Sequence, residues 1–185
     1  MHFAPDTEVD LAFIVTLCNT QPGASRTGAD ELAKPSDLTA ILDRAGYSGR
    51  FDRDETELAD VKAMRDHLRT VWSLPTAQAV TEINQIMADA AALPQLVKHD
   101  QFDWHIHATA NDAPLAERIG VEAAMAMSDV IRAGETERLR VCEADDCTGL
   151  LLDLSRNGSK RFCSIRCGNR MNMVAFRERA ASVTS

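Results

Sequence analysis

Four cysteines near the end of the sequence are the residues whose type and spacing could do chemistry. Cys142 and Cys147 have four residues between them, fifteen more follow, and Cys163 and Cys167 have three between them. A zinc ion prefers four soft ligands in a tetrahedron, and two close pairs on short turns can supply them with little ordering cost. The spacing predicts one structural zinc bound by all four thiolates.

A site whose four positions are filled by cysteine leaves no place for water, so we do not expect this zinc to be catalytic. Redox chemistry or an iron–sulfur cluster is a weaker interpretation, because the chain has no C-x-x-C pair and no βαβ pattern around its cysteines. The fifth cysteine, Cys18, lies in an apolar segment, where we expect it to be a small buried hydrophobic residue.

The elements that must position the four cysteines can be predicted from the residues around them. Residues 139–141 are expected to form a strand that leads into a knuckle with the first pair. Residues 149–154 and 161–163 are strand-like, and the turn-forming run 155–159 would join them as a hairpin. The second pair is expected to begin a helix and to share one face of it, where free N–H groups stabilise thiolates. Knuckle, hairpin and helix together predict a treble-clef-like zinc module.

Three short runs of this module carry a resemblance to a known family. They are Asp153-Leu154-Ser155-Arg156-Asn157, Arg161-Phe162-Cys163-Ser164 and Cys167-Gly168-Asn169-Arg170. Residues 138–180 resemble the CGNR zinc finger family, which is named after the last tetrapeptide. The second cysteine pair is one residue closer than the family often has, and Phe162 stands where tryptophan is frequent, but neither departure removes a zinc ligand.

The N-terminal half is similar to the ABATE domain, which accompanies this zinc finger in proteins described as stress-induced transcriptional regulators. The likeness rests on Asn19-Thr20, on the helix start Ser36-Asp37-Leu38, and on a helix with Met64-Arg65 and Leu68. The resemblance implies a zinc module that binds DNA and a helical domain that senses a small-molecule effector or forms a homodimer.

Charge is divided unevenly along the chain. The formal net charge is −8, yet residues 154–185 contain seven basic residues and one acidic residue. At about 100° per residue, Arg166, Arg170, Met173 and Arg177 form one stripe of the last helix, which could contact phosphates. The residues predicted to contact nucleic acid are Arg156, Lys160, Arg161, Arg166, Asn169, Arg170 and Arg177.

Other interpretations of this basic segment stay open. Four thiolates and one zinc carry a net negative charge, which nearby arginines and N–H groups must compensate. Arg170 is the residue most expected to have this structural role, paired with Asp153, and Asn169 could brace the hairpin. The segment could also dock on a partner protein, or on the acidic half of its own chain.

Residues 1–134 are predicted to form a helical domain with one β-hairpin. Helices are expected at about 9–20, at 37–45 after a cap at Ser36, at 54–72, at 76–92 with a cap at Thr76 and a buried face of Val80, Ile83, Met87 and Ala90, and at 113–133. Residues 95–109 alternate apolar and polar side chains about a turn at His99–Gln101, which is typical of a hairpin.

The second arm of this hairpin would separate two kinds of side chain. Phe102, Trp104 and Ile106 would share one face, while Asp103, His105 and His107 would share the other. Trp104 is expected in the core, as is Trp72 on its helix. His105 and His107, with His99 and Asp103 nearby, could form a second metal or ligand site, although exposed histidines are common on hairpins.

Composition limits the classes of protein that remain. The hydrophobic fraction of 45% is enough for a core, and the aromatic fraction of 5% favours helices. The early apolar run at 11–18 is too short to span a membrane, and the clustered cysteines fit a reducing cytoplasm better than a disulfide framework. No catalytic motif is present, so no enzymatic activity is predicted.

The sequence as a whole predicts a helical domain at 1–134 and a zinc finger at 135–185. The expected function is that of a DNA-binding transcriptional regulator. A protein-interaction adaptor is the first alternative, and a small-molecule enzyme is the second.

Overall fold

The computed structural model describes residues 3–98 and 104–183 of the chain. Its described elements are six α-helices, a 3₁₀ turn at Thr136–Arg138 and four short strands. In chain order the helices and strands are α1 (Pro5–Cys18), α2 (Pro35–Ala45), α3 (Glu55–Ser73), α4 (Thr76–Asp89), β1 (Gln95–Val97), β2 (His105–His107), α5 (Leu115–Arg132), β3 (Leu139–Val141), β4 (Leu150–Leu152) and α6 (Ile165–Val183). The predicted fold class, mainly helical with small β elements and a C-terminal four-cysteine module, is confirmed.

The ends of the helices follow local chemistry that the sequence shows only in part. Asp54, predicted as the first residue of its helix, instead caps α3 by accepting a hydrogen bond from the Glu57 N–H (2.8 Å). Gly46, with a φ of 67°, ends α2 in the left-handed conformation that favours glycine. The predicted cap at Ser36 is wrong. Helix α2 begins at Pro35, because proline suits the first helical turn, where a backbone N–H has no partner within the helix.

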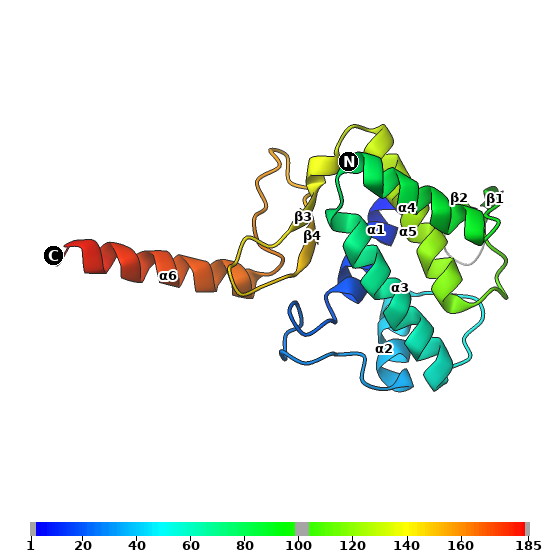
Figure 1. Cartoon of the computed structure of the whole chain (residues 1–185), viewed down its shortest axis with the longest axis horizontal. Coiled ribbons are helices and arrows are strands. Elements are labelled where there is room, and N and C mark those ends of the chain that lie inside the picture. Colours follow the sequence, from blue (N-terminus) through cyan, green and yellow to red (C-terminus); the bar gives the residue numbers. More distant parts are fainter. Residues whose placement is uncertain (1–2, 99–103, 184–185) are drawn as a thin grey trace.

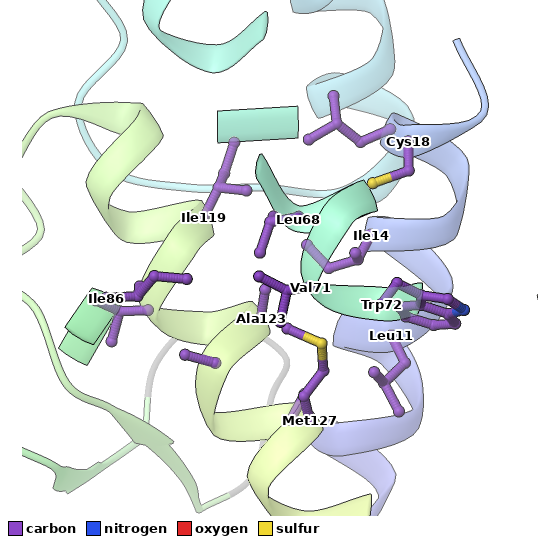
Figure 2. Packing of buried hydrophobic residues seen from close by; sticks show 14 of the residues in the cluster. Leu11, Ile14, Cys18, Leu68, Val71, Trp72, Ile86, Ile119, Ala123 and Met127 are labelled. Atoms are coloured by element: carbon purple, nitrogen blue, oxygen red, sulfur yellow. The ribbon is translucent and has the colours of Figure 1, made fainter. Parts of the chain in front are cut away.

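Helices α1, α3 and α5 pack against one another and form the centre of the core. Figure 2 shows side chains from the three helices meeting in one cluster. Its labelled members include Leu11, Ile14 and Cys18 from α1, Leu68, Val71 and Trp72 from α3, and Ile119, Ala123 and Met127 from α5. Each fully buried side chain of this size contributes about 1.5–3 kcal/mol, so this cluster supplies much of the driving force for folding.

Helix α4 covers the same core, but its start and its buried face differ from the prediction. The helix begins at Thr76 itself, which is therefore not a cap. Ile83 is buried as expected, but its buried neighbours are Ala79 and Ile86, while Val80 is 36% exposed. The predicted stripe and the observed one are both helically spaced in an alanine-rich segment. Periodicity alone therefore could not choose between them.

The predicted hairpin is present as β1 and β2, whose central pair is Leu96 opposite Ile106. Its turn lies outside the described residues, as do His99, Phe102 and Asp103. Trp104 is 67% exposed and Ile106 is 45% exposed, so the expectation that the Trp104 face enters the core is wrong. The helical core is already filled by side chains from the helices, and this short hairpin lies at its edge (Figure 1).

The zinc-module hairpin pairs different segments from those predicted. Strand β4 pairs with β3, so that Arg140 faces Leu151, and residues 161–163 are not a strand. Because alternate side chains of a strand point to opposite faces, β4 serves two clusters. Leu150 and Leu152 join the core of the helices, whereas Leu151 packs beside the cysteines.

Polar contacts strengthen this junction between the helices and the zinc module. The Asn19 side chain, just after α1, donates to the Leu150 carbonyl (2.9 Å) and accepts from the Leu150 N–H (2.7 Å). Arg69 of α3 donates to the carbonyls of Cys18 and Thr148, and the Trp72 indole donates to the Arg140 carbonyl. The two predicted parts, 1–134 and 135–185, are therefore in direct contact. Whether they fold as separate units stays a prediction.

Candidate metal centre and basic helix

The four cysteines come together from three places in the zinc module. Cys142 follows β3 and Cys147 precedes β4, while Cys163 and Cys167 flank the start of α6. All four sulfur atoms lie within 4.8 Å of one another. The Cys147–Cys163 and Cys163–Cys167 sulfur distances are 3.6 and 3.8 Å.

These distances allow a test of whether zinc fits. A tetrahedral zinc with Zn–S bonds of about 2.3 Å holds its sulfurs about 3.8 Å apart. The Cys147–Cys163 and Cys163–Cys167 distances match this value, the four sulfurs all lie within 4.8 Å of one another, and thiolates are the ligands that structural zinc sites use most. The predicted set of metal ligands is therefore assembled, and the site can hold one structural zinc.

Backbone N–H groups support the thiolates. The Cys163 N–H points to the Cys142 sulfur and the Gly149 N–H points to the Cys147 sulfur, each at 3.4 Å. Burial and the neighbouring thiols raise the pKa of Cys163, so metal binding must displace its proton. Such N–H groups stabilise the negative charge that four thiolates retain around zinc.

The prediction that Cys163 and Cys167 share one face of a helix is wrong. Helix α6 begins at Ile165, so Cys163 lies before it and only Cys167 lies within it. The Ser164 hydroxyl accepts a hydrogen bond from the Cys167 N–H (3.3 Å), which is the geometry of a helix cap. A serine directly before the helix is the sequence signal that could have placed this boundary.

Gly149 is a site residue that the sequence reasoning missed. A Cβ atom at this position would lie 2.7 Å from the Cys163 sulfur and 3.2 Å from the Cys147 sulfur. A Cβ atom essentially never lies as close as 2.7 Å to a sulfur atom, so a larger residue at position 149 would force the Cys163 ligand to move. A glycine just before a buried strand, two residues after a ligand, was the available signal.

Asp153 organises the loop between the cysteine pairs. Its fully buried carboxylate accepts hydrogen bonds from the backbone N–H groups of Ser155 (2.9 Å) and Lys160 (2.8 Å) and lies 3.4 Å from Arg140 Nη1. Burial alone would raise the pKa of Asp153, but the hydrogen bonds from Ser155, Lys160 and Arg140 outweigh it and lower the pKa. The carboxylate is therefore held charged, as a brace for the loop.

Arg170 has the structural role predicted for it, but with a different partner. Its guanidinium lies 3.6 Å from the Cys167 sulfur and pairs with Asp146 at 2.5 Å, rather than with Asp153. The Arg140 side chain, which comes from β3, takes the place beside Asp153 instead. Arg170 thus places a positive charge beside the thiolates, as a zinc–thiolate site requires.

Three more of the predicted nucleic-acid contacts are used within the protein. Arg166 donates to the carbonyls of Arg26 (2.6 Å) and Ser25 (3.1 Å), which fixes the first turn of α6 to the loop after α1. The Lys160 ammonium donates to the Leu152 carbonyl. Arg161 pairs with Glu143 at 2.6 Å, although its side chain remains 63% exposed.

The remaining three candidates are exposed. The side chains of Arg156, Asn169 and Arg177 make no hydrogen bond or ion pair with any residue that the structure describes. From about residue 172 onward α6 leaves the rest of the protein, as Figure 1 shows. On this part Met173 is 53% exposed and Phe176 is 61% exposed.

Comparison with protein families follows the same division of the chain. Residues 11–134 match the model of the ABATE family, whose description reads "Putative stress-induced transcription regulator". The chain belongs to the ABATE family. Residues 138–180 match the model of the CGNR zinc finger, so both resemblances are confirmed. A search of the curated proteins finds no match.

Several residues that carried the resemblance of this ABATE-family protein have structural roles. Asn19 holds Leu150, and Thr20 accepts a hydrogen bond from Arg65, which also pairs with Asp30. These contacts position the loop after α1 against α3 and the zinc module. Among the described residues, no helix has the length and apolar character needed to cross a membrane.

His99 and Asp103, which would complete the predicted metal or ligand site with His105 and His107, lie outside the described residues, so this site stays a prediction. The Nε2 atoms of His105 and His107 lie 2.9 Å apart. The four cysteines are the one described group in which three or more metal-binding side chains converge. The two histidines instead line a cavity of the helical domain, which is treated below.

Proposed function

We propose that this protein is a DNA-binding transcriptional regulator whose zinc module presents α6 to the duplex. The observation that carries the proposal is the C-terminal part of α6, which lies away from the rest of the protein from about residue 172 onward. This segment projects into solvent (Figure 1), contains Arg177 and Arg179 with Glu178 as its one acidic residue, and continues a helix whose first turn contains the zinc ligand Cys167. The regulator description of the ABATE family supports the same role.

An isolated helix of this kind has the dimensions that a duplex accepts. The major groove of B-DNA is about 12 Å wide and admits one α-helix. Asn169, Asn172 and Arg177 are exposed on α6, and amide and guanidinium groups can read base edges or bind phosphates. Arg156, on the loop before the second cysteine pair, would bind the adjacent backbone.

The charge of the remaining chain supports one orientation on DNA. Residues 1–153 contain 27 acidic and 13 basic residues, which a polyanion repels. Only the zinc-module end would then approach the duplex. The helical domain would stay outside and serve for sensing a ligand or for dimerisation. We propose binding rather than catalysis, in the reducing cytoplasm where zinc thiolates persist.

The salt dependence of binding tests the proposal. Zinc-loaded protein is titrated onto a fluorescent duplex at several salt concentrations, and the slope of log affinity against log salt is measured. Arg177→Gln should weaken binding and lower the slope by about one, because one phosphate contact is lost. Arg132→Gln, which removes an arginine 81% exposed at the end of α5, should change neither. Absence of duplex binding at low salt would overturn the proposal.

A protein-interaction adaptor is the second candidate, and the exposed apolar residues of α6 favour it. Ile165 is 84% exposed, and Phe176 and Met173 add further apolar surface. Apolar docking weakens little as salt rises, whereas phosphate contacts weaken steeply. Self-association that persists at high salt and is lost in Phe176→Ser would support this candidate, with a second copy of the chain as the partner.

A further inference from the structure

A cavity of about 290 Å³ opens in the helical domain. Strand β2 lines the cavity, and Figure 1 shows this strand at the end of the protein opposite α6. Four segments enclose it: the first half of α1, the residues after α2, strand β2 and the first half of α5. Its volume is near the lower end of small-molecule sites, which begin at about 300 Å³.

The walls and the mouth of this cavity are rich in apolar and aromatic side chains. The rings of Phe13 and Tyr47 stack with their centres 5.1 Å apart and form one wall. Val9, Trp104 and Ile106, exposed by 54%, 67% and 45%, line the cavity from α1 and β2. Apolar side chains that line a cavity and remain this exposed are expected where a ligand covers them.

Three carboxyl groups face the cavity from two helices. Asp6 and Asp10 lie one turn apart on α1, and Glu122 lies on α5. The Tyr47 hydroxyl donates to the Glu122 carboxylate at 2.5 Å. The Asp10 side chain, by contrast, has no hydrogen bond or ion pair within the described ranges 3–98 and 104–183.

The surroundings of Asp10 and Glu122 disfavour the charged form of both carboxyl groups. Burial, together with the negative charges of Glu122 and Asp6, raises the pKa of Asp10 to about 8. Burial also raises the pKa of Glu122, although the Tyr47 hydroxyl, Arg118 and His105 act against it. This cavity therefore holds more acid than its own basic groups compensate.

The basic groups that line the cavity make contacts with other groups of the protein. The Arg118 guanidinium donates to the carbonyls of Ser48, Arg50 and Ala113 and lies over the Tyr47 ring, so it holds the loop after α2. Arg118 is the one lysine or arginine among the described residues that line the cavity. The Nε2 atoms of His105 and His107 contact each other, so one of them must act as acceptor, and the pair cannot present two positive charges.

We infer that this cavity binds a small organic cation, a protonated amine with an apolar or aromatic body. The ammonium group would lie beside Asp10, with Asp6 and Glu122 adding negative charge. The body would lie against the Phe13 and Tyr47 rings, under Trp104. Aromatic faces attract cations, and a buried carboxyl without a partner gains most from one.

The inference gives a site to the sensing role within the proposed function, but the binding of the amine does not require DNA. Helix α1 connects the two ends of the protein. Asp10 and Phe13 line the cavity from α1, and Asn19, directly after its last residue, holds Leu150 of the zinc module. A ligand that shifts α1 would therefore act on β4.

Calorimetry with matched probes tests the inference at pH 8, without DNA. Cyclohexylamine, 2-phenylethylamine and tryptamine are each compared with the alcohol of the same skeleton, and 3-phenylpropanoate serves as the anion. We expect at least one amine to bind ten times or more tightly than its alcohol, and the anion to bind more weakly still. Amines that bind no better than their alcohols would overturn the inference, and so would preferred binding of the anion.

Variants locate the site. Asp10→Asn should lower the affinity for the amine tenfold or more. Glu122→Gln should lower this affinity less, because Glu122 already has Tyr47 as its hydrogen-bond partner. Asp60→Asn, an exposed carboxyl on α3, is the matched control. Fluorescence of Trp104 should change on binding and should be silent in Trp104→Phe, where buried Trp72 alone remains. Equal affinity in Asp10→Asn and in the unmodified chain would contradict the assignment.

The outcomes also separate this inference from the proposed function. Duplex binding without any amine binding would leave the regulator standing and remove the cavity assignment. Amine binding without duplex binding would support the cavity assignment and overturn the proposed function. A melting curve for each variant confirms that it is folded before its affinity is interpreted.

Discussion

The two ends of the protein treat buried negative charge in opposite ways. At the zinc end, Asp153 is fully buried and surrounded by donors, and its pKa is lowered. At the cavity end, Asp10 has no partner among the described residues, and its pKa is raised to about 8. The contrast separates a buried carboxyl group that stabilises the fold from one that is a candidate for binding a ligand. Asp153 serves structure within the chain, whereas Asp10 has no opposite charge beside it among the residues that the structure describes.

The largest expected effect tests whether the zinc end depends on its metal. Cys163→Ala should lower the metal content from about one zinc per chain to almost none, because zinc binding contributes about 10 kcal/mol or more in small modules. Hydrogen exchange should show that β3 and β4 lose protection, while the circular dichroism signal should show that the helices are retained. Cys18→Ala, which removes a buried thiol outside the site, should keep its zinc. Full zinc content in Cys163→Ala would refute the four-cysteine site.

A smaller effect tests how closely the cysteine pairs are packed. Gly149→Ala places a Cβ atom 2.7 Å from the Cys163 sulfur, so the ligands must move, at a cost of about 2–3 kcal/mol. Competition with a chelator should show weaker zinc binding. Gly158→Ala is the control: it has a φ of +59° but open space around it, so it should cost about 1 kcal/mol and leave zinc affinity unchanged. Equal zinc affinity in both variants would show that the packing at Gly149 is relaxed.

Much of the zinc end could be predicted from the sequence, because metal chemistry is local. Cysteine spacing identified the ligands, and strand β3 has the predicted bounds. The partner of β3 could not be predicted, because residues 149–154 form a plausible hairpin with either neighbour and only the helical core decides. Arg166 reaches a loop 140 residues away, a contact that no spacing rule reveals.

The cavity end was less accessible to sequence reasoning, for a physical reason. Its walls come from α1, the residues after α2, β2 and α5, which are distant in the chain and contribute one or a few residues each. His105 and His107 were singled out, but Asp10 was one acidic residue among 28 acidic residues. Only the packing of α1 against α5 shows that Asp10 and Glu122 share one space.

The joint between the two ends gives a third prediction. Asn19→Ala removes two hydrogen bonds to Leu150 and leaves that buried backbone without partners, which should cost about 2 kcal/mol in the free energy of unfolding. Urea unfolding followed by Trp72 fluorescence measures the loss, because the Trp72 indole contacts the Arg140 carbonyl across the same joint. Asn157→Ala, in an exposed loop, should be neutral. Equal stability of the two variants would show that apolar packing alone joins the ends.

The smallest expected effect concerns Asp10 itself and tests the contrast directly. Its pKa is about 8 in the folded chain and near 3.8 when unfolded, so the folded state binds the extra proton between these values. Stability should therefore fall as pH rises from about 4 to about 8 and level off above that. Asp10→Asn does not titrate, so its stability relative to the unmodified chain should grow over this interval. Because water reaches part of the carboxyl, we expect about 1–2 kcal/mol at pH 8.

Paired urea unfolding curves at pH 5, 6, 7 and 8 measure this difference, and the titration of the zinc site cancels because both proteins contain it. Asp60→Asn should follow the unmodified chain at every pH. Parallel curves for Asp10→Asn and the unmodified chain would mean that Asp10 is solvated, and the contrast between the two ends would then fail. A saturating amine should reduce the gap, because an ammonium group beside Asp10 favours the carboxylate that burial opposes.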